Sequence, residues 1–233
     1  MPFILGVIPA RGGSKGIPRK NLHLLCNVPL IKYTFDAAKA STMLSDVIVS
    51  TDSPEILNYA EHNGIKAPFL RPIELSADDA LAVPTIQHAV LSYESIYKVN
   101  VDIVVMLQPT APLRRDFDID HAINLLLNSP ADGLISVTDV NNCHPYKMKV
   151  INDGKLQDYL ETGLENPPRQ SLPPIYIVNG ALYICRRDVL IKKNSFKGNF
   201  CLPFVMPSER SANIDSLADF ALAEFFLNSA TTN

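Results

Sequence analysis

The chain has 233 residues, of which 47% are hydrophobic and 19% are charged, and this balance is typical of a globular protein built around one large core. Its formal net charge of −3 at pH 7 excludes a protein that binds nucleic acid or a membrane surface through overall positive charge. The sequence shows neither a basic leader followed by a long apolar stretch nor an apolar run of membrane-spanning length. We therefore expect a soluble cytoplasmic protein with no nucleic-acid and no membrane partner.

Some catalytic classes are excluded because their residues are missing or far apart. The sequence has no G-x-S-x-G turn and no H-E-x-x-H motif, and its five histidines are scattered, so a Ser/His hydrolase is a poor interpretation. The cysteines are too widely spaced for a C-x-x-C metal pair and too few for a disulfide scaffold. We expect reduced thiols at Cys26, Cys143, Cys185 and Cys201.

Apolar periodicity predicts strands and helices that alternate along the first 140 residues. We expect strands at residues 3–8, 46–50, 65–70, 102–107 and 133–138. Helices are expected between them, at residues 28–40, 55–63, 84–97 and 117–127. This alternation predicts an α/β fold with a doubly wound, mostly parallel, Rossmann-like sheet, whose functional loops gather at the carboxyl ends of the strands.

The alternation breaks at residues 141–176, a segment rich in prolines and amide side chains with only short candidate strands. Such an excursion from the main sheet is either an arm that packs on a second subunit or a flexible surface loop. Strands are expected again at residues 180–185 and 202–206, and a helix at 216–227. We therefore predict a single domain over residues 1–233, with an inserted arm at 141–176.

The first loop, residues 8–22, has the composition of a phosphate-binding segment. It reads IPARGGSKGIPRKNL, with three glycines, one serine and no carboxylate. Glycines let backbone N–H groups approach an anion, and arginine and lysine neutralise its charge. The alternative is a surface turn with incidental charges. Neither the Walker A nor the G-x-G-x-x-G register fits this loop. Its cations are Arg11, Lys15, Arg19 and Lys20.

A second candidate site is the segment before the last helix. Asn213 and Asp215 are two residues apart, so in an extended segment both side chains point to the same side and can offer oxygens to one Mg²⁺. The alternative for Asp215 is a helix N-cap, because a helical run follows it. Asp52, in S-T-D-S, poses the same choice, and there we favour the cap.

Seven motifs together resemble the acylneuraminate cytidylyltransferases, the family of CMP-sialic acid synthetases. They occur in the order and approximate spacing of that family: I-P-A-R-G-G-S-K-G-I-P-R-K-N-L, V-S-T-D-S, F-L-R-P-I-E-L, L-Q-P-T-A-P-L-R, P-R-Q-S-L-P-P, N-G-A-L-Y and N-I-D-S-L-A-D-F. The resemblance implies a nucleotidyltransferase fold and a reaction in which CTP and a nine-carbon 2-keto sugar acid give a CMP-sugar and pyrophosphate. It also implies a homodimer held by the arm.

The resemblance further implies roles for individual residues. It places Arg11, Lys20 and Asp215 in catalysis, and Mg²⁺ on Asp215 and Asn213. Its nucleotide-binding positions are Ala10, Arg11, Gly12, Gly13, Ser14, Lys20, Asn21 and Arg71. Its sugar-binding positions are Gln108, Arg169, Gln170 and Asn179.

Two departures from the family pattern leave alternatives open. Asn213 stands where many members have the first aspartate of a D-x-D motif, and Ile177-Val178 stands where several sialate-specific relatives carry an arginine. The nonulosonic acid is thus not fixed by the sequence. The alternatives are a cytidylyltransferase for another keto sugar acid, such as an octulosonic acid, and a non-catalytic nucleotide-binding regulatory protein.

Overall fold

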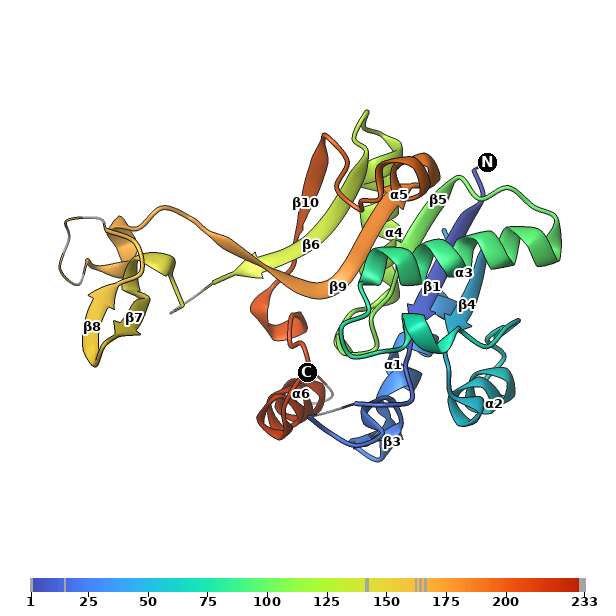
Figure 1. Ribbon diagram of the computed structural model, residues 1–233, viewed down its shortest axis with the longest axis horizontal. Helices are drawn as coiled ribbons and strands as arrows, with labels where there is room; N and C mark the ends of the chain where they lie inside the picture. Colours follow the sequence, from blue (N-terminus) through green and yellow to red (C-terminus); the bar gives the residue numbers. More distant parts are fainter. Residues whose placement is uncertain are drawn as a thin grey trace.

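The computed structural model describes residues 2–14, 16–140, 143–161, 163, 165 and 167–230. At its centre is a six-stranded sheet in the order β10-β6-β9-β5-β1-β4 (Figure 1). All neighbouring strands are parallel except β9, which runs antiparallel to β5 and β6. The strands are β1 (Ile4–Pro9), β4 (Asp46–Ser50), β5 (Ile103–Met106), β6 (Gly133–Asp139), β9 (Tyr176–Arg186) and β10 (Cys201–Val205). The predicted mostly parallel α/β sheet is confirmed.

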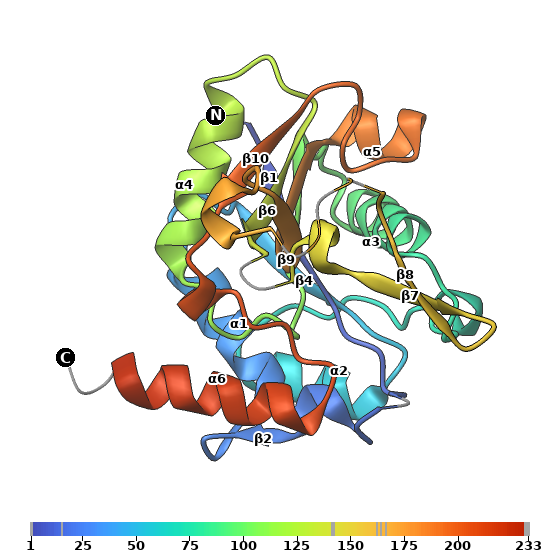
Figure 2. The ribbon, with the colours of Figure 1, turned by 90° about the vertical axis from the view of Figure 1, so that its left-hand side faces the viewer.

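Helices cover both faces of this sheet (Figures 1 and 2). On β1, Ile4 and Ile8 join one buried cluster while Leu5 and Val7 join the other, because side chains alternate along a strand. The first cluster includes residues of α1 (Leu30–Ala40), α2 (Pro54–His62) and α4 (Asp116–Leu127). The second includes residues of α3 (Ala82–Tyr97) and α5 (Arg187–Lys193).

Two predicted elements differ from the structure for local reasons. The strand expected at 65–70 is wrong: the segment makes only isolated bridges to β4 and Thr51, because Pro68 interrupts the run and has no N–H for a ladder. The first helix begins at Leu30 rather than at residue 28. Residues 28–29 instead form β3 (Val28–Pro29), paired with β2 (Leu24–Leu25) in a hairpin.

The last helix, α6 (Leu217–Ala230), packs against the first loop of the chain. A third buried cluster joins Ile17, Leu25 and Leu30 to Ile214 and Phe220. Figure 2 shows α6 lying beside β2 and close to the start of α1. The fold thus brings the loop after β1 together with the segment near residue 215, some 200 residues later in the chain.

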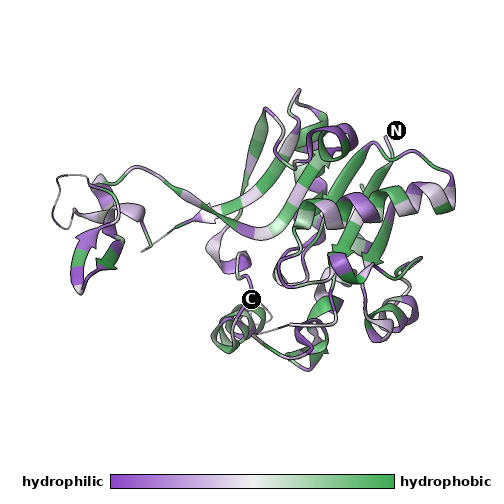
Figure 3. Ribbon diagram, viewed as in Figure 1, coloured by the Kyte–Doolittle hydropathy of each residue, from purple (hydrophilic) through white to green (hydrophobic). Residues whose placement is uncertain are grey.

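A hairpin of β7 (Lys149–Asn152) and β8 (Lys155–Asp158) projects from the body (Figure 1). It is joined to the sheet through the outer ends of β6 and β9, which pair from Val137 to Asp139. Figure 3 shows the hydrophobic residues concentrated in the strands of the central sheet. The hairpin, by contrast, is exposed along nearly its whole length.

The hairpin lies inside the arm predicted at 141–176, of which residues 141, 142, 162, 164 and 166 lie outside the described residues. Its role in dimerisation stays a prediction. Over the described ranges, no helix combines the length and the apolar character needed to cross a membrane.

Candidate active site

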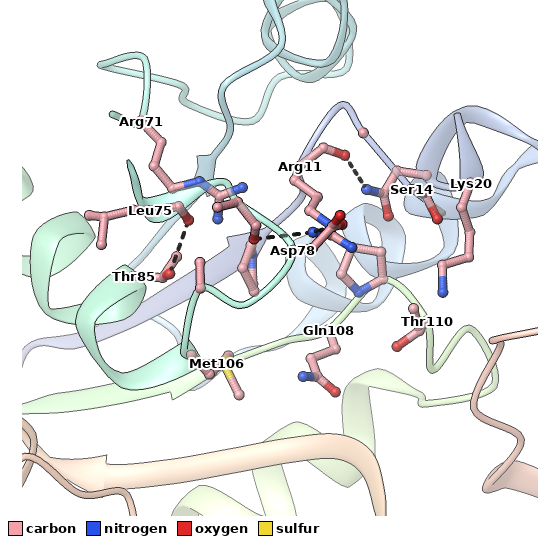
Figure 4. Close-up of a pocket in the computed structure, with 17 residues that line it drawn as sticks. Arg11, Ser14, Lys20, Arg71, Leu75, Asp78, Thr85, Met106, Gln108 and Thr110 are labelled. Carbon is pink, nitrogen blue, oxygen red and sulfur yellow. Dashed lines mark hydrogen bonds and ion pairs between the residues drawn. The ribbon is translucent and has the colours of Figure 1, made fainter. Parts of the chain in front are cut away.

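A cavity of about 320 Å³ opens at the carboxyl ends of β1 and β5 (Figure 4). Its walls are the first loop, the segment from Arg71 to Ala82 and the start of the β5–α4 loop. Doubly wound sheets bind ligands at this edge. Seven predicted site residues line the cavity: Arg11, Gly13, Ser14, Lys20, Asn21, Arg71 and Gln108.

Arg11 is held by the opposite wall of the cavity. Its Nη1 lies 2.8 Å from Asp78 Oδ1 and donates to Ala77 O at 3.2 Å. Asn21 Nδ2 donates to the backbone carbonyl of Arg11 at 2.9 Å. Both the main chain and the side chain of Arg11 are therefore held in place. About a third of the Arg11 side chain and nearly half of that of Asp78 are exposed, so an anionic ligand can compete with Asp78 for the guanidinium.

Lys20 joins the two ends of the chain. Its Nζ lies 3.0 Å from Asp215 Oδ1 and donates to Ile214 O at 2.8 Å. The Lys20 side chain is 16% exposed and that of Asp215 is 76% exposed. Arg19 instead pairs with Glu55 on the outside of the loop, and Lys15 lies outside the described residues. Of the loop cations that the structure describes, Arg11 and Lys20 line the cavity.

Asp52 braces the first loop and does not cap a helix, which corrects the favoured interpretation. Its Oδ1 accepts the Gly12 N–H at 2.9 Å and lies 3.7 Å from Arg71 Nη2. The cap of α2 is Ser53, whose Oγ accepts from Ile56 N. A Cβ at Gly12 would lie 2.9 Å from Ser53 Cβ, so this close approach requires glycine.

Arg71 is a buried cation of the cavity wall, with a side chain that is only 4% exposed. Its Nε donates to Ser76 Oγ at 3.0 Å. Burial lowers the pKa of Arg71 and the positive charge of Arg11 lowers it further, while Asp52 opposes both. Ala10, also predicted to contact the nucleotide, is fully buried at the end of β1 and does not line the cavity.

Asn213 and Asp215 point to the same side of an extended segment. Both are exposed whereas Ala212 and Ile214 are buried, the alternation that the sequence analysis expected. Asp215 is not a helix cap, because another residue takes that role.

That residue is Ser216, which forms a reciprocal capping pair with Asp219. Asp219 Oδ2 accepts the Ser216 N–H at 2.7 Å and Ser216 Oγ accepts the Asp219 N–H at 3.4 Å. The Asp215 carboxylate is therefore free of helix capping. Among the described residues no group of three His, Cys, Asp or Glu is close enough to hold a metal.

Gln108 lines the cavity, and the Asn179–Gly180 bulge lies behind it. Asn179 is 3% exposed: its Oδ1 accepts from Ser136 Oγ at 2.6 Å and its Nδ2 donates to Ser211 Oγ at 2.9 Å. Gly180 has φ +75°, and a Cβ there would lie 2.8 Å from Gln108 Oε1. The Gln108 amide thus rests on the Gly180 backbone, and Asn179 holds that backbone in place.

Arg169 and Gln170 belong to a short 3-10 helix, Arg169–Ser171, in the arm segment. Gln170 is exposed, and the structure does not bring this helix to the cavity of its own chain. No role was predicted for Asp78, which pairs with Arg11. The sequence feature that could have pointed to Asp78 is the polar, Asp-containing segment that follows Arg71.

These observations define an α/β protein with a cationic pocket at the carboxyl ends of its parallel strands, lined also by the Gln108 amide. Residues 5–192 match the sequence profile of the cytidylyltransferases, and the chain belongs to this family. It is 33% identical over 223 residues to CMP-N,N'-diacetyllegionaminic acid synthase of Legionella pneumophila, with 95% of this chain and 94% of the relative covered. It is 35% identical to N-acylneuraminate cytidylyltransferase of Escherichia coli, covering 94% of this chain and 51% of the relative.

Among solved structures, the fold is similar to CMP:2-keto-3-deoxy-manno-octonic acid synthetase in complex with CTP. The TM-score is 0.69 at 19% identity, over 99% of this chain and all of the other. This likeness concerns the fold alone. The predicted family and nucleotidyltransferase fold are confirmed.

Proposed function

We propose that this protein transfers CMP from CTP to a nine-carbon 2-keto sugar acid and releases pyrophosphate. The observation that carries the proposal is the cavity itself, where Arg11 and Lys20 of the first loop meet Arg71 from a second segment. Three cations around one cavity suit a triphosphate. The relatives named above act on two different nine-carbon acids, so the substrate class is proposed here and not one member of it.

The chemistry is an in-line displacement at the α-phosphorus of CTP. The anomeric hydroxyl of the sugar acid forms a new P–O bond and loses its proton, while the bond to the β-phosphate breaks and pyrophosphate leaves. Such a transfer requires alignment and charge neutralisation more than a protein nucleophile. Arg11 and Lys20 stabilise the growing charge on the phosphates, and both must exchange their present partners, Asp78 and Asp215, for phosphate oxygens.

The residues present fit Mg²⁺ bound mainly by substrate phosphates. Asp215 offers one carboxylate and Asn213 one amide oxygen from the same side of the chain, which is enough for an ion that keeps most of its coordination for phosphates and water. When bound, Mg²⁺ would neutralise phosphate charge. Asn213 brings no negative charge, so Asp215 is the principal protein ligand in this proposal.

The test is pyrophosphate release with CTP, Mg²⁺ and a panel of nonulosonic acids, with an octulosonic acid as a further acceptor. We expect release with at least one nine-carbon acid. Release with the octulosonic acid alone would contradict the proposed substrate class. Binding of CTP without release from any acceptor would contradict an enzyme and favour a regulatory nucleotide-binding protein.

We also propose that the arm joins two copies of the chain. Ile151 and Leu156 face each other across the projecting hairpin and are 74% and 69% exposed, and adjacent exposed apolar side chains are typical of interfaces. Because Arg169–Ser171 lies away from its own cavity, a second copy would be needed to bring these residues to a site.

Light scattering after gel filtration tests the dimer, and Ile151→Lys with Leu156→Lys should yield a monomer. A mixture of two inactive variants, Arg11→Ala and Arg169→Ala, tests the shared site. After statistical exchange of subunits, about one quarter of the wild-type activity should return. No recovery in exchanged dimers would show that each site is built from one chain.

A further inference from the structure

Arg114 is a fully buried cation behind Gln108 and the Asn179–Gly180 bulge, which we call the acceptor end of the site. It is the largest of the fully buried side chains, with an exposure of 2%, and it does not line the cavity. It closes the loop that starts at Gln108 and leads into α4. Neither the proposed binding of CTP nor the proposed phosphate chemistry uses it.

The guanidinium connects three separate elements of the fold. Its Nη1 donates to Ala181 O at 2.8 Å and to Gln108 O at 3.3 Å, and its Nη2 donates to Thr34 Oγ1 on α1 at 2.8 Å. A planar guanidinium holds such acceptors in fixed directions, which a lysine ammonium does not. Arg114 therefore sets the position of the Gln108 backbone relative to the β9 backbone just after Gly180.

These contacts matter for the site because the Gln108 amide rests on Gly180. The same loop reaches the other end of the reaction centre: Thr110 O accepts the Ile214 N–H at 2.8 Å, next to Asp215. A displacement of this loop would move Gln108 away from the Gly180 bulge and loosen the segment that carries Asp215.

Arg114 forms no direct ion pair with a carboxylate among the described residues. Asp118 raises the pKa of Arg114 electrostatically, but its direct partner is Arg210, whose Nη2 and Nε approach it at 2.8 and 3.3 Å. Burial lowers the pKa of Arg114 to about 10, so the side chain remains cationic at neutral pH. Arg114 Nε has no partner among the described residues. A buried cation without a paired anion is costly, and apolar packing would be more stable.

We propose that Arg114 is a positioning residue for the acceptor: its guanidinium locks the Gln108 loop to the Gly180 bulge, and its buried charge favours an anionic acceptor at that end. The inference rests on the proposed function, because the acceptor is the sugar acid. A carboxylate close to this end of the cavity would be attracted through protein of low polarity, where screening by water is weak. CTP binds at the other end, among cations of its own.

The test compares Arg114→Met, which removes both the charge and the planar guanidinium, with Arg114→Lys, which keeps only the charge. The matched control is Arg186→Met, because Arg186 also donates to two backbone carbonyls, of Ala131 and Ser129 at 2.9 Å each, but does so away from the cavity. We expect Arg114→Met to raise the KM of the sugar acid about tenfold or more. The KM of CTP should stay within about twofold, and Arg114→Lys should fall between Arg114→Met and wild type.

A rise in both KM values, no rise in either, or an equal effect in Arg186→Met would overturn the positioning role. A lysine variant as weak as the methionine variant would overturn the role of charge. If Arg114→Met does not fold, Thr34→Val removes one acceptor of the guanidinium more gently. It should raise the KM of the sugar acid about two- to threefold, and an unchanged KM would count against the inference.

Failure of the proposed function is distinguished by the wild-type protein. If wild type binds CTP but releases no pyrophosphate with any acid, the proposed reaction is wrong. The positioning role of Arg114 is then tested by amide hydrogen exchange. The exchange rates at residues 108–113 and 179–182 should be higher in Arg114→Met than in Arg186→Met. Equal exchange in the two variants would contradict it.

Discussion

The two ends of the cavity are built in opposite ways. At the phosphate end, Arg11 and Lys20 pair with carboxylates that are largely exposed, Asp78 and Asp215. At the acceptor end, the polar groups around Asn179 are buried and satisfied by one another. Exposed ion pairs contribute little and exchange readily, whereas buried hydrogen bonds are costly to break. At the phosphate end, Arg11 and Lys20 can therefore exchange their carboxylate partners for phosphate oxygens. At the acceptor end, the hydrogen bonds around Asn179 keep the backbone rigid.

The largest effect should come from removing a cation at the phosphate end. We expect Arg11→Ala to lower turnover by about 10²- to 10³-fold, because the guanidinium stabilises charge that grows on the phosphates. Steady-state pyrophosphate release measures this. Arg19→Ala is the matched control, since Arg19 belongs to the same loop but pairs with Glu55 outside the cavity. Near-normal turnover in Arg11→Ala would remove this residue from the mechanism.

The next effect concerns Mg²⁺, for which the proposed site has one carboxylate ligand, Asp215. We expect Asp215→Ala to raise the Mg²⁺ concentration for half-maximal rate by about tenfold or more, because it removes the only charged protein ligand of the proposed site. The reverse change, Asn213→Asp, should lower that concentration by restoring a second carboxylate. Mg²⁺ titrations that coincide for both variants and wild type would show that this segment does not hold the metal.

A smaller effect is expected when the competitor for Arg11 is weakened. Asp78→Asn removes the negative charge that holds Arg11 Nη1 at 2.8 Å, so CTP no longer displaces a carboxylate. Since half-exposed pairs are worth up to about 1 kcal/mol, the KM of CTP should fall by about two- to fivefold. Asp79→Asn, next in the chain and also exposed, is the control. A KM that rises in Asp78→Asn would show that Asp78 assists nucleotide binding.

The smallest effect on catalysis, with a clear effect on stability, should follow from Ser211→Ala at the acceptor end. Ser211 Oγ accepts from the buried Asn179 Nδ2, and an unsatisfied buried amide costs about 1–3 kcal/mol. The thermal midpoint should fall by several degrees, as measured by calorimetry. Ser229→Ala, which removes an exposed hydroxyl that donates only to Phe225 O, should leave it unchanged. Equal midpoints would mean that the Asn179 network does not support the fold.

Much of the fold follows from local patterns in the sequence. Continuous apolar runs located β1, β4, β5 and β6, and helical spacing located α3, α4 and α6, because these elements bury one face or both. Helix α5 was missed, and the hairpin of β7 and β8 was predicted only as short candidate strands. Helix α5 has only seven residues, too few to show a period. The hairpin of β7 and β8 buries almost nothing, so its sequence carries no apolar alternation.

The site was predictable where its residues are adjacent in sequence and less so where they meet through the fold. The cations of the first loop stand out in the sequence by composition, and seven of the predicted residues line one cavity. The contact of Asp78 with Arg11 depends on how two loops face each other. Arg114 lies within a recognised motif, but the sequence does not show that its partners are Thr34 and Ala181. The cap of α2 was predicted one residue too early, at Asp52 rather than Ser53, because Asp and Ser are equally good caps. For Asp215 the cap was one of two open alternatives, and Ser216 takes that role.

One further consequence concerns β9, a single strand of 11 residues. Its outer end, at Tyr176, pairs beside the projecting hairpin, and its middle carries Asn179 and Gly180 in the site. Tyr176, which pairs with Asp139, is only four residues from Gly180 along one backbone. A partner bound to this outer end of β9 would therefore act close to the acceptor, and by reciprocity the bound acceptor would change the affinity for that partner.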